Sequence, residues 1–425
     1  MSQPLVYRLR CAAQNYAWGK LGADSKVAQY IKALDDFAVE SDKPYAELWM
    51  GTHPNGPSTL AIQPTSFLKD VIKSKPELIT PELAKIYNGD LPFLFKVLSV
   101  GKALSIQAHP DKKLGKELFE KYPNIYKDPN HKPEMAVAIT EFETLCGFRP
   151  LEEIVVFLSE YPEFRDLVGN DVASTFVQTV SGRECSEIVE EVESNKVALR
   201  QLFASLMTAD PNNVVACVKK LVSRLQPNNY PIGSTQELLV RLNEQFPGDV
   251  GIFCVFMLNY VKLEPGQAMF LGANEPHAYL FGDCVECMAT SDNVVRAGLT
   301  PKFKDVPILV NMLTYRYGNA KSQILTPISY NNSSSSLLYD PPIEEFSVIL
   351  TNLNTQYQKE FFKSIAGPSI IIITEGKGVL QIENKSEVLE PGSVFFVGAN
   401  VPITIELDND CDKLISYRAF WMLKS

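Results

Sequence analysis

A short polar face at residues 104–109 could bind a metal ion. The segment reads Leu-Ser-Ile-Gln-Ala-His, and as a β-strand it would place Ser105, Gln107 and His109 on one face. The preceding run, residues 91–100, is apolar enough to be a buried strand, so this polar face is expected to point into an interior. Burying a glutamine beside a histidine is costly unless a partner satisfies both. A metal ion and a hydrogen-bonded polar pair are both compatible with this segment.

An internal repeat draws attention to His277. Residues 263–277 align without gaps on residues 389–403, and both copies contain Leu-Glu-Pro-Gly followed by Gly-Ala-Asn-x-Pro. This pattern indicates two related β-barrels in one chain. His277 in the first copy is replaced by Ile403 in the second, so the fold does not require the histidine.

Glu134 could complete a metal site with these residues. Pro133 disfavours a helix and favours a strand in which Lys132 and Glu134 point the same way. Two imidazoles, a carboxylate and an amide oxygen form a donor set that suits Zn²⁺ or another divalent first-row metal. The predicted ligands are therefore Gln107, His109, Glu134 and His277. His131 is an alternative ligand, because His-x-x-Glu can chelate from a helix, but Pro133 and the strand register argue against it.

Two further segments carry candidate functional groups. Cys284 and Cys287 have no second cysteine pair and would face opposite sides of a strand, which leaves Glu286 as the residue of interest between them. Arg296, Lys302 and Lys304 form a basic cluster that could bind an anion in this acidic chain. The same three side chains could equally be ordinary solvated surface residues.

The elements that must position these groups suggest a mainly β fold with an α-helical insertion. Helical spacing of apolar residues runs through residues 151–245, whereas strand patterns dominate before it and return from Gly251, beginning with residues 252–262. The polar residues 331–336 are interpreted as a link between domains. We therefore expect a catalytic domain of residues 1–150 and 246–325, a helical domain of residues 151–245 and a C-terminal β domain of residues 326–425.

Composition excludes several functional classes. The 425 residues carry a net charge of −10 and show no basic stripe, which argues against nucleic-acid and anionic-membrane partners. We see no signal peptide and no membrane span. The eight scattered cysteines favour reduced thiols and a cytoplasmic location.

Seven stretches in family order resemble type I mannose-6-phosphate isomerases (phosphomannose isomerases): residues 14–20, 43–54, 91–99, 104–112, 130–136, 276–279 and 291–302. The resemblance implies cupin (jelly-roll-like) β-barrels, one Zn²⁺ per chain on the four predicted ligands, and a catalytic arginine at Arg296. It also implies interconversion of D-mannose 6-phosphate and D-fructose 6-phosphate through a cis-enediol, serving GDP-mannose synthesis and mannose catabolism. We expect small sugar phosphates as partners and a monomeric protein.

The implied chemistry assigns provisional roles to the remaining residues. Arginine is too basic for easy proton transfer, so Arg296 is expected to stabilise negative charge while Glu286 or Lys132 handles protons. Substrate contacts are expected from Ser105, Tyr279 and Lys302. Two other classes remain open: a cupin-type metal oxygenase, which would hold Fe(II), and a non-catalytic sugar-binding cupin that has lost its metal.

Overall fold

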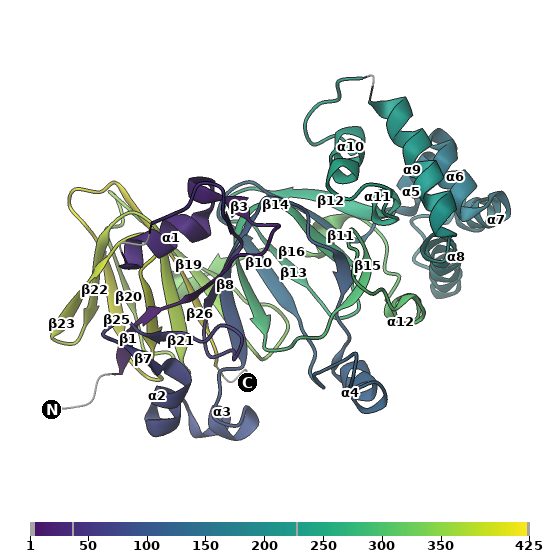
Figure 1. The fold of residues 1–425 in the computed structure, drawn as a ribbon. Coiled ribbons are helices and arrows are strands. Elements are labelled where there is room, and N and C mark those ends of the chain that lie inside the picture. Colours follow the sequence, from purple (N-terminus) through teal and green to yellow (C-terminus); the bar gives the residue numbers. More distant parts are fainter. Residues whose placement is uncertain (1–4, 36–37, 227, 423–425) are drawn as a thin grey trace.

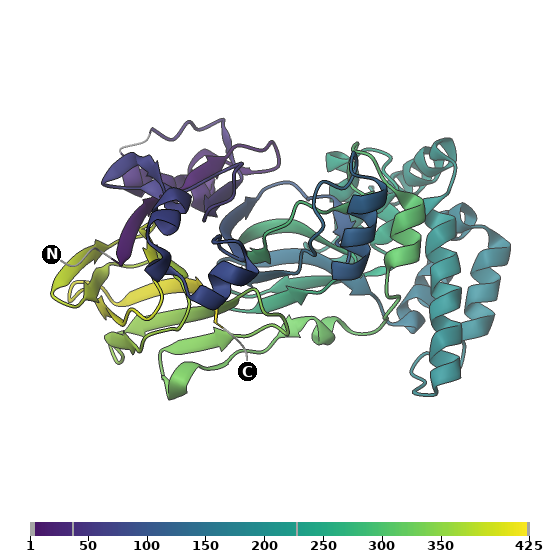
Figure 2. The same ribbon diagram turned by 90° about the horizontal axis from the view of Figure 1, so that it is seen from below.

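Two large β-sheets stand side by side, and a bundle of helices caps the end of the molecule farthest from both chain termini (Figures 1 and 2). The computed structural model describes residues 5–35, 38–226 and 228–422. Residues 1–4 and 423–425, at the ends of the predicted catalytic and C-terminal domains, lie outside the described residues. The prediction of a mainly β chain with helices is confirmed.

The central sheet carries the predicted metal ligands. Its spine is the long strand β14, which pairs with β8, β9, β10 and β11. All eight residues of β8 are buried, in agreement with the apolar run in the sequence. In chain order its strands are β2 (Ala12–Gln14), β5 (Glu47–Met50), β8 (Phe93–Val100), β9 (Ile106–Ala108), β10 (Glu134–Ala138), β11 (Phe142–Phe148), β12 (Leu258–Leu263), β13 (Ala268–Leu271), β14 (His277–Ala289), β15 (Val295–Gly298) and β16 (Ile324–Leu325).

The second large sheet belongs mostly to the C-terminal part of the chain. Its order is β17-β18-β19-β26-β21-β24-β1-β6-β7, and a smaller sheet has the order β20-β25-β22-β23. Their strands are β1 (Val6–Arg10), β6 (Thr59–Leu60), β7 (Gln63–Phe67), β17 (Ile328–Ser329), β18 (Ser336–Tyr339), β19 (Ser347–Asn354), β20 (Lys359–Phe362), β21 (Ser369–Glu375), β22 (Gly378–Ile382), β23 (Lys385–Leu389), β24 (Val394–Val397), β25 (Ile403–Leu407) and β26 (Lys413–Phe420). A short hairpin joins β3 (Lys20–Leu21) to β4 (Pro44–Tyr45).

The N-terminal strands connect the two large sheets. β1 lies in the range expected for the catalytic domain, yet it pairs with β24 of the second sheet, with Val6 opposite Val397. β6 and β7 extend the same sheet. Pairing with β1 satisfies the backbone groups along the edge of β24, and nothing in the local sequence of β1 specifies which edge it joins.

The interpretation of residues 331–336 as a link between domains is wrong. Residues 331–335 separate β17 from β18 within the C-terminal sheet, Ser336 begins β18, and the hydroxyls of Ser333, Ser335 and Ser336 donate hydrogen bonds to Glu360. The chain instead passes from the central sheet to the C-terminal sheet between Leu325 and Ile328. The serine-rich composition of this segment is explained by these hydrogen bonds to the Glu360 carboxylate.

The two copies of the repeat adopt the same backbone path. β13 in the first copy corresponds to β24 in the second. Gly266 and Gly392 both have positive φ, at 84° and 93°, and Asn274 and Asn400 follow at 62° and 61°. Left-handed backbone favours glycine and asparagine, which explains why both copies keep these residue types.

The helical insertion contains α5 (Leu151–Glu160), α6 (Pro162–Val168), α7 (Asn170–Val180), α8 (Val189–Met207), α9 (Pro211–Leu225) and α10 (Thr235–Gln245). The Ser234 hydroxyl accepts a hydrogen bond from the Glu237 amide and caps α10. The remaining helices are α1 (Lys26–Asp35), α2 (Leu68–Ser74), α3 (Pro81–Ile86), α4 (Lys112–Lys121), α11 (Gly251–Cys254) and α12 (Val306–Met312). No helix in the described part of the chain is long and apolar enough to cross a membrane.

The predicted strand at residues 252–262 is wrong in its first half. α11 occupies Gly251–Cys254, and β12 begins only at Leu258. Residues 252–258 are completely buried in the core that they share with the helical insertion. A short continuous apolar run is compatible with a buried helix or a buried strand, so periodicity could not distinguish the two.

Candidate metal centre and active site

Three buried side chains converge at the central sheet. His109 follows β9, Glu134 begins β10 and His277 begins β14, so three strands deliver one group each. The Nε2 atoms of His109 and His277 each lie 3.3 Å from an oxygen of Glu134. One ligand atom from each residue lies within 4.8 Å of the others, so the group could hold one metal ion.

Backbone carbonyls orient both imidazoles toward the carboxylate. His109 Nδ1 lies 2.6 Å from the Asn293 carbonyl oxygen, and His277 Nδ1 lies 3.0 Å from the Glu275 carbonyl oxygen. A proton on each Nδ1 leaves a lone pair on each Nε2. Such outer hydrogen bonds are the usual means of fixing a metal-binding histidine.

The donor set fits a cation. His109 Nε2, His277 Nε2 and Glu134 Oε2 are buried without a hydrogen-bond partner among the described residues. Burial lowers the pKa of His109 to about 4, so the ring is neutral at physiological pH. Burial would raise the pKa of Glu134, but the charge of Lys132 holds it well below its usual value. Lone pairs facing an ionised carboxylate are stabilised by a divalent ion between them.

Strand register places Gln107 and Arg296 beside this group. Gln107 lies directly opposite His277 of β14 on one side and Arg296 of β15 on the other. Directly paired residues project from the same face of a sheet. Both side chains are half-buried, and burial lowers the pKa of Arg296 below its ordinary value. Gln107 as the fourth ligand stays a prediction.

Lys132 and His131 point in opposite directions, as the sequence indicated. Lys132 Nζ lies 3.2 Å from Glu134 Oε1, so it is next to the metal-binding group. His131 Nε2 lies 2.6 Å from Glu345 Oε1 in the C-terminal part of the chain. The structure therefore directs the rival ligand away from the centre.

Glu286 belongs to a buried ionic cluster, centred on Lys96, that sequence reasoning missed. Lys96 Nζ lies 3.0 Å from Glu286 and 3.5 Å from Glu47, and Trp49 donates a hydrogen bond to Glu47. Burial and the nearby carboxylates raise the pKa of Glu286, although Lys96 opposes them. Burial would lower the pKa of Lys96, but the carboxylates outweigh it and raise the pKa. The sequence signal that could have revealed this cluster is Lys96, a single lysine within the otherwise uncharged and buried β8.

The predicted substrate residues occupy three different settings. Tyr279 is buried, and its hydroxyl has no hydrogen-bond partner among the described residues. Burial and the charges of Glu286 and Glu134 raise its pKa well above the usual value. Ser105 is half-buried just before β9, and Lys302 is exposed beyond β15. Ser105 precedes the strand we expected it to join, because β9 begins only at Ile106.

The second repeat has lost more than its histidine. Glu134 pairs with Leu271 and Met288 in the central sheet, and Ser369 pairs with Val397 and Phe420 in the same way. Ala136 faces Glu286, whereas Ile371, at the matching position, faces Arg418. The register thus places a serine and an arginine where the first copy has Glu134 and Glu286, which removes the carboxylate ligand of the metal-binding group.

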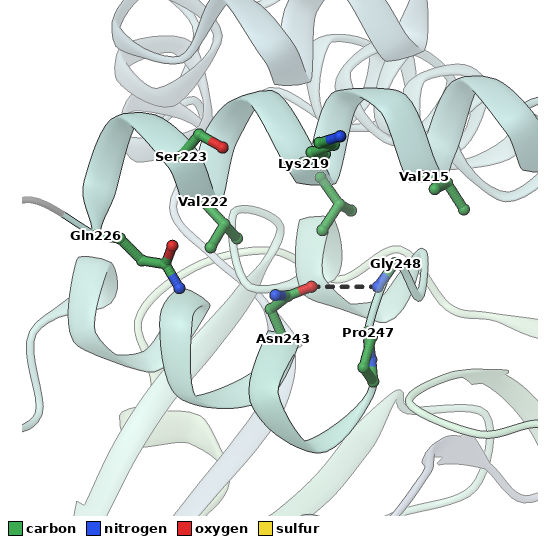
Figure 3. A pocket seen from close by; sticks show the side chains of 9 residues that line it. Val215, Lys219, Val222, Ser223, Gln226, Asn243, Pro247 and Gly248 are labelled. Carbon is green, nitrogen blue, oxygen red and sulfur yellow. Dashed lines mark hydrogen bonds between the residues drawn. The ribbon is translucent and has the colours of Figure 1, made fainter.

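A surface pocket in the helical insertion is separate from this centre. It measures about 320 Å³ and lies between α9 and α10. Figure 3 shows Val215 and Val222 in its wall, with Asn243 accepting a hydrogen bond from the Gly248 amide. Lys219 is the one charged residue among the described residues that line this pocket. The described lining therefore lacks a cluster of titratable groups like the one formed by His109, Glu134 and His277.

Comparisons with known proteins agree with this site. Models of the type I phosphomannose isomerase family match residues 6–151 (catalytic domain), 167–258 (helical insertion domain) and 336–385 (C-terminal). Mannose-6-phosphate isomerase of Aspergillus fumigatus is 50% identical, covering 98% of this chain and 96% of that protein. The Saccharomyces cerevisiae enzyme of the same name is 44% identical, with 98% of each chain covered.

Solved structures give the same result. A single-residue variant of phosphomannose isomerase from Salmonella typhimurium matches with a TM-score of 0.81 and 33% identity, covering 98% of this chain and 100% of that one. A zinc-bound mannose 6-phosphate isomerase also matches with a TM-score of 0.81 and 33% identity, over 99% of this chain and 100% of the other. These full-length similarities, together with the buried His109, Glu134 and His277 group, show that this chain belongs to the type I phosphomannose isomerase family.

Proposed function

We propose that this chain is a zinc-dependent isomerase that interconverts D-mannose 6-phosphate and D-fructose 6-phosphate. The observation that carries the proposal is the convergence of His109, Glu134 and His277, whose buried ligand atoms lack partners among the described residues. The relatives reported above are named mannose-6-phosphate isomerase, and their similarity covers nearly the whole chain. Gln107 is the proposed fourth ligand, because its strand register puts it beside His277.

The proposed reaction moves a proton between C1 and C2 of the sugar through a cis-enediol. Zinc, when bound, would polarise the substrate oxygens as a Lewis acid. Arg296 lies across from Gln107 and carries a positive charge close to the centre, so it is suited to stabilise the enediolate oxygen. Its high basicity makes it a poor proton carrier.

Glu286 and Lys132 are the proposed proton-handling groups. Burial and neighbouring carboxylates raise the pKa of Glu286, which brings a carboxyl closer to the range in which it can both take and return a proton. Lys132 lies against Glu134, so it could transfer a proton beside the metal. Ser105, Tyr279 and Lys302 are the proposed substrate contacts, and the exposed Lys302 suits a phosphate at the rim of the site.

Metal analysis of the purified protein tests the proposal directly. We expect one zinc per chain, loss of mannose 6-phosphate turnover on chelation, and recovery when zinc is returned. Full activity in zinc-free protein would contradict the proposal. Iron with oxygen consumption would favour the oxygenase alternative, and sugar binding without metal or turnover would favour a binding protein.

Several finer expectations stay predictions. They are the cupin identity of the two related barrels, a monomeric state, a cytoplasmic location, and service to GDP-mannose synthesis and mannose catabolism. The negative net charge argues against nucleic acid as a partner.

A further inference from the structure

Glu345 joins the C-terminal part of the chain to the metal centre. It lies two residues before β19, yet only 2% of its side chain is exposed. Its Oε1 atom is 2.6 Å from His131 Nε2 and 3.1 Å from Lys112 Nζ. Both partners belong to the loops and helix around the central sheet.

The two partners of Glu345 hold equivalent places next to the metal ligands. Lys112 lies three residues after His109, at the start of α4. His131 lies three residues before Glu134, just ahead of β10. One carboxylate therefore ties together the two segments that carry two of the three converging groups. It contacts the face of residues 131–134 opposite to the one on which Lys132 and Glu134 meet.

The Glu345 carboxylate is held in its ionised form by its two partners. Burial would raise its pKa, but His131 and Lys112 outweigh burial and lower the pKa to about 2. The carboxylate is therefore ionised at neutral pH and can accept both hydrogen bonds, which are stronger than neutral ones. A proton on His131 Nε2 is required for the shorter contact.

The C-terminal sheet also supports the back of β10. Met135 and Val137 belong to the same buried cluster as Phe346, which follows Glu345 directly. The Tyr417 hydroxyl donates a hydrogen bond to the Ala138 carbonyl at 3.4 Å. The strand that carries Glu134 is thus packed against the second sheet along its length and anchored ahead of its first residue.

We propose that Glu345 is a positioning residue that sets the spacing between His109 and Glu134 and keeps Lys132 against Glu134. The C-terminal part of the chain, whose own copy of the repeat has lost its metal-binding residues, thereby contributes to zinc retention in the first copy. This inference rests on the proposed zinc-dependent function.

The test compares Glu345→Gln and His131→Gln with Glu344→Gln in the zinc-loaded protein. Glu344 is the adjacent but exposed acid, so it is a matched control for loss of one negative charge. The main readout is the rate of zinc release to a chromophoric chelator without substrate. Groups that hydrogen-bond a metal ligand directly are typically worth about 10–100-fold in metal affinity, and Glu345 acts through one further residue, so we expect release up to about 10-fold faster in the first two variants and unchanged release in the control.

Two further measurements separate positioning from general destabilisation. Because Glu345 and His131 share one hydrogen bond, the double variant with both substitutions should release zinc about as fast as Glu345→Gln alone. If the two substitutions acted independently, their separate increases in the release rate would multiply. We also expect kcat for mannose 6-phosphate to fall more than KM rises, because Glu345 is buried against Lys112 and His131 and is not one of the proposed substrate contacts. If Glu345→Gln fails to fold, His131→Gln alone decides the question, since its side chain is 12% exposed and it leaves the carboxylate with Lys112.

The outcomes distinguish this inference from the proposed function. Folded Glu345→Gln and His131→Gln proteins that release zinc at the control rate would overturn the positioning role. An unmodified chain that holds zinc but does not turn over mannose 6-phosphate would contradict the proposed function, while faster zinc release in the variants would still support positioning. An unmodified chain that binds no zinc would overturn both.

Discussion

Replacing Lys96 with methionine should destabilise the protein more at high pH than at low pH. Lys96 is 8% exposed and is the cation between Glu286 and Glu47. At an effective dielectric constant of about 20, a 3.0 Å ion pair is worth about 5 kcal/mol before the cost of burying it. Removing one partner of a buried pair typically costs about 3–5 kcal/mol, because the other charge stays buried and unpaired. We expect a loss of unfolding free energy in that range for Lys96→Met.

The pH dependence follows from the sign of the Glu286 shift. Burial and neighbouring carboxylates already raise its pKa, and loss of Lys96 would raise it further. An acid with a raised pKa in the folded state binds protons more tightly there, so stability increases as pH falls toward the ordinary pKa of the group. The loss should therefore be largest near about pH 8 and clearly smaller near about pH 5.5.

Urea unfolding followed by tryptophan fluorescence measures this effect, since Trp49 lies against Lys96 with the ammonium 5.1 Å from its ring centroid. Lys43→Met is the control, because Lys43 forms an exposed pair with Glu40 and should change stability by less than about 0.5 kcal/mol. Adding Glu286→Gln to Lys96→Met should recover about 1–2 kcal/mol near about pH 8 and less near about pH 5.5, where the carboxyl is already protonated. The reasoning is refuted if the double variant is no more stable than Lys96→Met near about pH 8.

Three further substitutions probe the reaction and the core. Glu286→Gln should lower kcat in a coupled assay by about 10²-fold or more with little change in KM, and near-normal turnover would exclude it as the proton carrier. Lys302→Glu should raise KM for mannose 6-phosphate more than it lowers kcat, and equal effects on both would count against a pure phosphate role. Phe256→Ala should cost about 3–5 kcal/mol of stability, measured by thermal and urea unfolding, because its ring is fully buried and lies 4.5 Å from that of Tyr161. A loss below about 1 kcal/mol would show that the surrounding helices collapse into the cavity.

The nature of the site could be inferred from residue types and local periodicity. Extended backbone leading into a strand alternates its side chains, so Lys132 and Glu134 were expected to share a face and His131 to leave it. The repeat showed that a histidine at position 277 was unnecessary for the fold, which made a chemical role the better explanation. The seven matching stretches then identified the family without any coordinates.

Pairings between distant segments could not be inferred in this way. β1 joins the C-terminal sheet, and Lys96 meets Glu286 across 190 residues of sequence. Glu345 reaches His131 across 214 residues. Each of these contacts depends on which strand edges and buried faces meet, and local sequence carries little information about that choice.

What the sequence determined by itself was therefore the set of groups able to bind a metal and the local direction in which each one points. Tertiary structure alone decided that His109, Glu134 and His277 meet within one cluster, that Lys96 balances Glu286, and that Glu345 holds both ligand-bearing segments. The physical reason is that side-chain alternation depends only on neighbouring backbone angles, whereas buried charges must find their partners among residues that the whole fold brings together.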